Sequence, residues 1–363
     1  MKKKCLIASL LVSALCLSLS SCGDPSAAVP GTPPPGGAPS ASGGAEVYHL
    51  RMSTLHTSGT PGFEYCNWFI DRVAELTDGN VSIELFPGSQ LGDYTATYGE
   101  LIAGSLDLSW ESVAAEYDIR LQIMGAPYVV TNWDEVKYAY TTDSWLGQYM
   151  GAIHESQGVK ELGIAPGGFY GVGGKDVGDL DTLFDTSVPQ RVLCRVPPQS
   201  VSVATMEALN FTPTTINYSD LYSALQTGVA NCWYGGSVDL NYDNFRDVIT
   251  YYVAYNYTNE WFPLLMSQAS LDKLPQEYQD AIVQAGQEAT SAAYDIVYEN
   301  YYGYFDKLKE AGITIIEPTE AEMAEMSEHV RDVVWAQLEG EIGSEDIQGL
   351  RDFVEQMHAD LAD

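Results

Sequence analysis

Two arginines lie close together in the segment RVLCRVPPQS, residues 191–200 of a chain whose formal net charge is −33. Positive charge is scarce, because the chain has 17 lysines and arginines against 50 aspartates and glutamates. A guanidinium is always charged and its planar fork matches the two oxygens of a carboxylate, so Arg195 is a candidate for binding an organic anion. Pro197 and Pro198 restrict the backbone just beyond it. A structural salt bridge of Arg195 is the alternative.

Arg191 carries less weight than Arg195. It lies at the start of the strand predicted for residues 190–196, where we expect a solvated strand end.

Motifs of catalysis and of metal binding are absent from this sequence. The glycine-rich segment GGFYGVGGKD (167–176) departs from a phosphate-binding loop, because Phe169 occupies the place of the first glycine of GxxxxGK[ST] and Asp176 replaces the hydroxyl residue. The five histidines are scattered without an HExxH pattern, and no GxSxG elbow occurs. We therefore expect no enzyme, no metal site and no cofactor. A secreted hydrolase with an unpatterned site is the alternative.

Polar and aromatic residues follow several predicted strands. In open α/β sheets, ligands bind at the carboxyl ends of strands, so these residues predict one cleft between two lobes. The candidates that share this placement are His56, Glu111, Phe169, Tyr170, Arg195, Trp233 and Tyr234. Glu111, His56 and Asp93 have chemistry suited to binding hydroxyls or a bridging metal, with capping and core packing as the alternative roles.

Strand and helix patterns alternate along the body of the chain. The first series comprises a strand over 48–55, a helix that starts at Thr60 and Pro61 and ends before Gly79, and a strand over 81–86. The second comprises a strand over 190–196, helices over 201–209 and 219–226, and a strand over 229–234. Two such series predict two α/β lobes.

A long helical pattern covers residues 276–309, where apolar residues recur every three to four positions. At roughly 1.5 Å per residue this helix spans about 50 Å, so we expect it to brace both lobes. A strand over 313–318, a helix over 320–338 and a last helix from Ser344 complete the chain.

The first 22 residues have the pattern of an export signal. Lys2, Lys3 and Lys4 precede a short apolar run, and the segment closes with Leu-Ser-Ser-Cys22, which resembles the lipobox of bacterial lipoproteins. Residues 23–45 are almost wholly proline, glycine, serine and alanine, the composition of a tether. We therefore expect a protein lipid-anchored through Cys22 at the outer face of the bacterial cell membrane, on the periplasmic side in a Gram-negative cell.

The remaining composition limits the partners. An excess of acidic residues disfavours nucleic acid and anionic lipid headgroups, because like charges repel. Within the body, Cys66, Cys194 and Cys232 have no CxxC or Cys/His metal spacing. At most one disulfide is expected, with Cys194–Cys232 the better candidate, and three unpaired thiols are the alternative.

Several segments carry a family resemblance. The run RVPPQSVSVATMEALNFTPTTINYSDLYSALQTGVAN (195–231) resembles the signature region of the DctP-type solute-binding subunits of tripartite ATP-independent periplasmic (TRAP) transporters. VSIELFPGSQLGD (81–93), APYVVTNWDEV (126–136) and LPQEYQDAIVQAG (274–286) are similar to the same family in the same order.

The resemblance implies a two-lobed, periplasmic-binding-protein-like α/β fold with a long helix across both lobes, and no catalysis. Its carboxylate-binding arginine corresponds to Arg195. Such proteins deliver small organic acids to small and large membrane subunits for ion-gradient-driven uptake. We expect residues 46–165 mainly in the first lobe, 166–248 mainly in the second, 249–273 back in the first, and 274–363 in the bracing helix and C-terminal elements.

Two positions depart from the family pattern. Tyr170 lies where many members have a second arginine, and Gly235 lies where an asparagine often binds the ligand. Polar contacts are thereby lost and aromatic surface is gained, which predicts a monocarboxylate ligand with an apolar or aromatic body. Trp233, Tyr234, Phe169 and Tyr170 are the expected walls. A sensing module that presents the bound acid to a membrane receptor is the alternative function.

Overall fold

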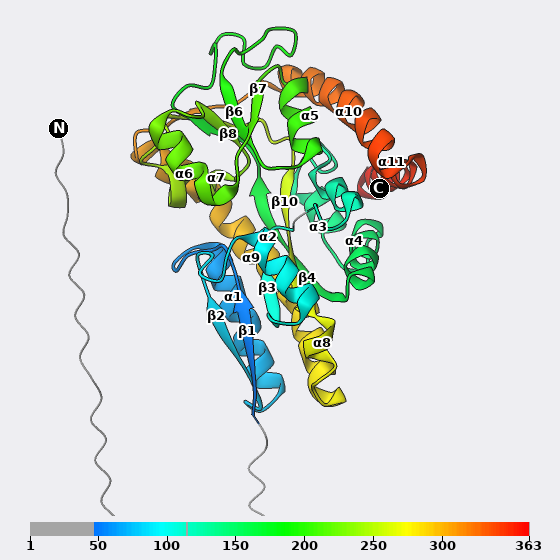
Figure 1. Ribbon diagram of the computed structural model, residues 1–363. Helices are drawn as coiled ribbons and strands as arrows, with labels where there is room; N and C mark the ends of the chain where they lie inside the picture. The colour runs from blue at the N-terminus through cyan, green and yellow to red at the C-terminus, as the bar shows by residue number, and fades with distance from the viewer. Residues whose placement is uncertain (1–46, 114, 363) are drawn as a thin grey trace, which may run out of the picture. The chain divides into compact units, whose positions relative to one another are not determined.

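The structure is a computed structural model that describes residues 47–113 and 115–362. The export segment 1–22 with Cys22 and the tether 23–45 lie outside the described residues. A compact unit runs from Ala45 to Asp363. It contains two β-sheets, each flanked by helices, so the fold is the predicted two-lobed α/β class (Figure 1).

The first sheet has five strands in the order β2-β1-β3-β10-β4. Their bounds are β1 Tyr48–Ser53, β2 Val81–Phe86, β3 Leu108–Trp110, β4 Val159–Phe169 and β10 Asn259–Ser267. β1, β2 and β3 are parallel, whereas β10 is antiparallel to β3 and β4. The carboxyl ends of β1 and β3 and the start of β10 therefore share one edge of the sheet.

The second sheet has six strands in the order β11-β9-β5-β8-β6-β7. Their bounds are β5 Val172–Gly174, β6 Leu193–Val196, β7 Thr212–Thr215, β8 Cys232–Tyr234, β9 Tyr251–Val253 and β11 Thr314–Ile316. β6 is parallel to both neighbours and pairs Arg195 with Thr214 and Trp233. β6 begins later than predicted, because Arg191 has a positive φ of 57° that interrupts the extended backbone.

The chain crosses between the sheets after β4, through Tyr170 and Gly171, and again between β9 and β10. The two crossings are hydrogen-bonded to each other. The Tyr170 N–H donates to the Thr258 carbonyl over 2.8 Å, and the Asn256 N–H donates to the Tyr170 carbonyl over 2.8 Å. The lobes are thus joined by neighbouring segments whose positions are coupled.

β10 was not predicted from the sequence. Its interior WFPLLM is a continuous apolar run without alternation, because the strand is buried in the middle of its sheet. Pro263 also argues against a central strand. In the structure β3 pairs only with residues 264–266 of β10, so Pro263 lies beyond the end of that ladder.

The helices largely follow the predicted pattern, and α1 begins as expected. Pro61 is its first residue, and the Thr60 side chain accepts a hydrogen bond from the Phe63 N–H over 3.3 Å. The other bounds are α2 Tyr94–Ala103, a 3₁₀ helix η1 Ile119–Gly125, α3 Trp133–Ala139, α4 Trp145–Ser156, α5 Ser200–Ala208, α6 Tyr218–Thr227, α7 Val238–Leu240, a π-helical turn η2 Asn241–Phe245, α8 Gln268–Leu271, α9 Gln276–Glu310, α10 Glu320–Ile342 and α11 Ser344–Ala362.

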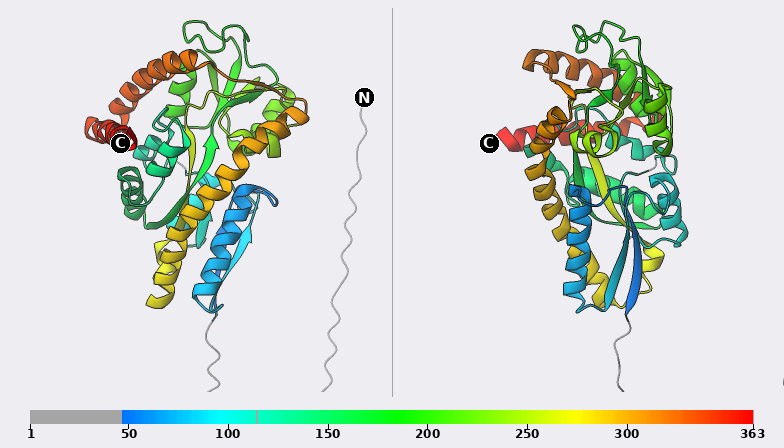
Figure 2. Two further views of the ribbon diagram at one scale, coloured as in Figure 1. Left: turned by 180° about the vertical axis from the view of Figure 1, so that it is seen from behind. Right: turned by 90° about the vertical axis from the view of Figure 1, so that its left-hand side faces the viewer.

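The predicted long helix is α9, which has 35 residues. It packs against α1 and β4 in the first lobe and against α7 and β11 in the second, so it braces both lobes as predicted (Figure 2). It makes a close contact with β4 at Gly286. A Cβ atom added there would lie 2.6 Å from the Cβ and from the carbonyl oxygen of Leu162. Glycine therefore permits the contact that docks α9 on β4.

We expect Gly286→Ala to destabilise the protein by about 1–3 kcal/mol, because overpacking at a rigid contact outweighs the helix propensity gained. Gly303→Ala in the same helix is the matched control, since Gly303 is exposed and an added Cβ meets nothing within 4 Å. The control should stabilise the protein by about 0.5–1 kcal/mol. Urea unfolding measures both, and stabilisation by both substitutions would contradict the close contact.

Candidate ligand-binding site

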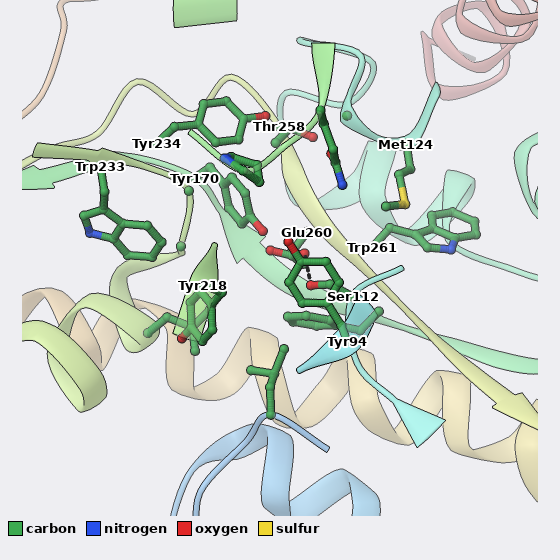
Figure 3. Close-up of a pocket in the computed structure, with 18 of the residues that line it drawn as sticks. Tyr94, Ser112, Met124, Tyr170, Tyr218, Trp233, Tyr234, Thr258, Glu260 and Trp261 are labelled. Carbon is green, nitrogen blue, oxygen red and sulfur yellow. Dashed lines mark hydrogen bonds between the residues drawn. The ribbon is translucent and has the colours of Figure 1, made fainter. Parts of the chain in front are cut away.

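A cavity lies between the two sheets, at the strand ends that face each other (Figure 3). Its volume is about 90 Å³. The first lobe contributes Leu55, Tyr94, Ser112, Glu260 and Phe262 to its lining, and the second contributes Arg195, Tyr218, Trp233 and Tyr234. Tyr170, from the crossing segment, also lines it. The predicted cleft between the lobes is therefore present, at the predicted edges of the sheets.

Arg195 is buried at the second-lobe wall of this cavity, with 3 % of its surface exposed. Its Nε donates to the carbonyl of Ile216 over 2.7 Å, and its Nη2 is buried with no hydrogen-bond partner among the described residues. No carboxylate within the described part of the chain forms an ion pair with it. Burial therefore lowers the pKa of the guanidinium, with Tyr94 and Tyr218 opposing the shift. Burying a charge without a counter-ion costs free energy. An anion bound at this wall of the cavity would therefore be stabilised by Arg195.

Three tyrosines form an aromatic stack beside Arg195. The rings of Tyr234 and Tyr257 are stacked with centroids 4.7 Å apart, and Tyr170 meets both edge-on at 6.0 Å. The Tyr257 hydroxyl donates to the Gly171 carbonyl over 3.2 Å and accepts from the Gly235 N–H over 2.9 Å. Tyr170 and Tyr234 are thereby held as a rigid apolar wall.

Trp233 lies over a glycine turn at the end of β8. Gly235 and Gly236 have φ of 108° and 75°, values that L side chains rarely adopt. A Cβ at Gly236 would lie 2.2 Å from the indole ring, and one at Gly235 would lie 3.3 Å from it. The indole N–H donates to Asn241 Oδ1 over 3.0 Å, which fixes the ring. The backbone at Gly235 and Gly236 is therefore coupled to the position of the Trp233 indole.

Opposite Arg195, the first lobe presents a carboxyl group. Glu260, the second residue of β10, is half-buried, and its Oε1 accepts a hydrogen bond from Ser112 Oγ over 2.8 Å. Burial raises the pKa of Glu260 to about 8, with the Ser112 hydrogen bond opposing. Burial also raises the pKa of the Tyr94 phenol to about 12, where the Arg195 charge opposes and Glu260 adds to the shift.

Two further polar groups of the lining lack hydrogen-bond partners among the described residues. These are the oxygen and the nitrogen of the Asn259 side-chain amide. Sequence reasoning missed Asn259, Glu260 and Trp261 because it did not predict β10. The available signal was the polar pair Asn259-Glu260 directly before a buried apolar run.

The structure brings together four of the seven ligand-binding candidates, namely Arg195, Tyr170, Trp233 and Tyr234. Phe169 is outside the lining, because it ends β4 and packs edge-on against Trp133 and Tyr301 at 5.5 and 6.3 Å. The expectation that it walls the cleft is corrected: its ring belongs to the contact between β4, α3 and α9.

Glu111 and His56 are likewise buried beside the cavity and not in its lining. Glu111 Oε1 accepts from Thr97 Oγ1 over 2.7 Å, and burial raises its pKa to about 7. His56 Nε2 is 2.7 Å from the Tyr65 hydroxyl, and burial lowers the pKa of its ring to about 3. Both are corrected to core roles, which were the alternatives. Asp93 is the N-cap of α2 and accepts from the Ala96 N–H over 3.2 Å.

The other reactive residues are apart from the cavity. Arg191 is exposed and precedes β6. Cys194 and Cys232 are opposite one another on β6 and β8, and with Cys66 they are buried thiols without a disulfide. Within residues 47–113 and 115–362, no cluster of three histidine, cysteine or acidic side chains is arranged to hold a metal.

No helix in the same ranges is long and apolar enough to span a membrane.

Comparison with known proteins assigns most of the body of the chain to one protein family. The sequence model of the family described as "Bacterial extracellular solute-binding protein, family 7" (DctP) matches residues 52–340. The C4-dicarboxylate-binding periplasmic protein DctP of Rhodobacter capsulatus is 22% identical over 313 residues, which cover 85% of this chain and 91% of that protein.

Solved structures have the same fold. The sugar acid binding protein DctPAm of Advenella mimigardefordensis, in complex with galactonate, is 20% identical with a TM-score of 0.78, covering 86% of this chain and 99% of that one. A TRAP periplasmic solute binding protein of Sulfurospirillum deleyianum with bound succinate is 21% identical with a TM-score of 0.75, covering 84% and 99%.

The buried acids and histidines predict an acidic optimum of stability. Burial raises the pKa of four carboxyls: Glu111 to about 7, Glu161 and Glu260 to about 8, and Asp239 to about 6. The folded state keeps these protons while the unfolded chain releases them near pH 4.5, so the free energy of unfolding falls as pH rises toward 8. His56 and His154, with pKa values lowered to about 3, destabilise the fold below about pH 6.5.

Because the four carboxyls outnumber the two histidines, we expect the melting temperature to be highest near pH 4.5 and to decline by several degrees at pH 8.5. Glu161→Gln should reduce the decline, because it removes one of the four carboxyl groups that hold a proton in the folded state and lose it in the unfolded chain. Melting curves recorded from pH 4 to pH 9 measure this, and a melting temperature that rises from pH 6 to pH 8.5 would contradict it.

Proposed function

The chain belongs to family 7 of the bacterial extracellular solute-binding proteins, and on that premise we propose that it captures a small organic acid and delivers it to the membrane subunits of a TRAP transporter for ion-gradient-driven uptake. The family consists of solute-binding receptors outside the cytoplasm and not of enzymes. One observation carries the proposal for this chain: Arg195 is a buried guanidinium that has no counter-ion among the described residues, in the wall of a cavity between the lobes.

Arg195 would hold the carboxylate of the ligand. Its Nε is engaged by Ile216, which leaves the Nη atoms as donors, and the unpartnered Nη2 is one of them. A carboxylate in this place supplies both the missing charge and the missing acceptor. The relatives support this assignment, because C4-dicarboxylate, galactonate and succinate, named for them, all carry a carboxylate.

The remainder of the ligand would be apolar or aromatic and small. Tyr170, Tyr234 and Trp233 offer a rigid wall. The resemblance described above, in which Tyr170 corresponds to a second arginine of many family members, agrees with a less polar ligand. The cavity of about 90 Å³ is smaller than the engineered protein cavity of about 150 Å³ that binds benzene, so it favours the smaller acids of this class. A larger aromatic acid would require the lobes to open further.

The segment before the described residues would anchor the protein. Cys22 would be acylated after cleavage, and the tether of residues 23–45 would hold the binding body at the outer face of the membrane. An anchored receptor stays close to the membrane subunits that it supplies.

Replacing Arg195 should abolish binding. We expect Arg195→Met to weaken the ligand by at least about 30-fold, since truncating one partner of a buried charge pair costs about 2–5 kcal/mol. The ligand-free variant should be no less stable than the wild type, because an uncompensated buried charge is removed. The measurement is a thermal-shift screen against monocarboxylates, dicarboxylates, aromatic acids and sugar acids, where a 100-fold excess over Kd stabilises by about 2.7 kcal/mol.

Arg191→Met is the matched control, because Arg191 is exposed, lies outside β6 and has the same charge. It should keep the full ligand shift. Equal shifts in wild type and Arg195→Met would refute the arginine clamp, and tightest binding by dicarboxylates or polar sugar acids would refute the apolar ligand.

Anchoring has its own test. In an expressing bacterium the wild type should fractionate with membranes and incorporate labelled palmitate, whereas Cys22→Ser should do neither. Cys16→Ser, within the apolar run of the same segment, is the control and should remain anchored. The same distribution for wild type and Cys22→Ser would exclude the lipid anchor.

A further inference from the structure

We propose that the ligand carries a protonated amine as well as its carboxylate, with Glu260 receiving the amine while Arg195 holds the acid. The substrates would then be amine-bearing monocarboxylates, of which the small α-amino acids are the simplest. This inference rests on the proposed function and narrows its substrate class. The residues that carry it are the one basic and the one acidic side chain of the cavity lining, Arg195 and Glu260.

Glu260 has an unused acceptor. Ser112 Oγ donates to its Oε1 over 2.8 Å, and no described residue hydrogen-bonds or ion-pairs with its other oxygen (Figure 3). Burial raises its pKa to about 8, and no cationic side chain among the described residues forms an ion pair with it. A buried carboxylate is stabilised chiefly by a cation that also donates hydrogen bonds.

Arg195 and Glu260 do not satisfy each other. No ion pair within 4.0 Å joins them in the described part of the chain, although Tyr94 lies close enough to both that each shifts the pKa of its phenol. The guanidinium and the carboxyl group therefore line the same small cavity from two different sheets. A ligand with a carboxylate at one end and an ammonium near the other would neutralise both.

Other ligand groups fit Glu260 less well. A second carboxylate would meet a like charge, which penalises dicarboxylates unless a proton is shared. A hydroxyl needs only a neutral acceptor, so it does not explain the cost of burying an acid. An ammonium supplies both charge and donors, and it would lower the pKa of Glu260 and keep the carboxylate ionised.

Aromatic rings near Glu260 add to this environment. Tyr94, Tyr170 and Tyr218 line the cavity, and the faces of such rings attract cations, most strongly when water is excluded. Figure 3 shows Tyr94 beside the Ser112–Glu260 pair. Tyr170, which we assign to the wall for an apolar ligand body, is thus also compatible with an ammonium group.

Each charge belongs to a different lobe. Arg195 is on β6 of the second sheet, and Glu260 is on β10 of the first. A ligand with both charges would connect the lobes through two charge-assisted contacts, whereas an acid without an amine would be held at one end only.

Matched ligand pairs test the inference. We would measure Kd by calorimetry for the full-length protein at pH 7 with alanine and propanoate, valine and 3-methylbutanoate, and phenylalanine and 3-phenylpropanoate. The amine-bearing member of at least one pair should bind about tenfold or more tightly, as expected for a hydrogen bond to a charged group. Glu260→Gln should remove most of that preference without weakening the amine-free acid, and should improve binding of succinate.

Glu161→Gln is the matched control, because Glu161 is also a buried glutamate with a pKa of about 8 but lies outside the lining. It should keep the amine preference. The wild-type comparison alone decides the matter if Glu260→Gln does not fold.

The experiments distinguish a failure of the amine inference from a failure of the proposed function. If acids without nitrogen bind as tightly as the amines, or more tightly, and Arg195→Met abolishes their binding, the amine inference is wrong and the proposed function stands. If no carboxylate binds, or Arg195→Met binds as well as the wild type, the proposed function fails and the inference with it.

Discussion

The antiparallel pairing of β4 with β10 is the interaction on which the rest of the molecule depends. β10 lies in the middle of the first sheet, and both strands continue to the crossings that lead into the second sheet. α9 docks on β4 through the close contact at Gly286 and reaches the second lobe. One ladder therefore places Glu260, sets where Tyr170 emerges, and fixes the helix that both lobes share.

The cavity has few ionisable side chains in its lining, although the protein as a whole is strongly acidic. Its lining contains one guanidinium and one carboxyl, and neither has an ionic partner among the described residues. Both groups lose hydration in the folded state, and burial disfavours the charged form of each. Binding of a ligand with complementary charge recovers this free energy, and that recovery is how such a site can be selective with few contacts.

The sequence predicted most of the framework, because that framework follows from local patterns. The Thr60-Pro61 start of α1, the apolar spacing of α9 and the strand ending at Arg195 are each visible in a few neighbouring residues. β10 could not be recognised, because a strand buried on both faces does not alternate between apolar and polar residues. Pro263 also argued against a strand at this place. The half of the cavity that β10 carries, Asn259 to Trp261, was lost with it. His56, Glu111 and Phe169 were assigned to the cleft because they follow strands, but a position at a strand end does not say whether a side chain points outward or into the core.

The turn after β8 has an evolutionary consequence. The indole of Trp233 occupies the space in which a Cβ atom at Gly236 would lie and is close to the place of one at Gly235, and both glycines have positive φ. A side chain introduced at either glycine therefore requires a shift of the indole or of the local backbone. We accordingly expect Trp233, Gly235 and Gly236 to be kept together or replaced together among relatives, and not one at a time.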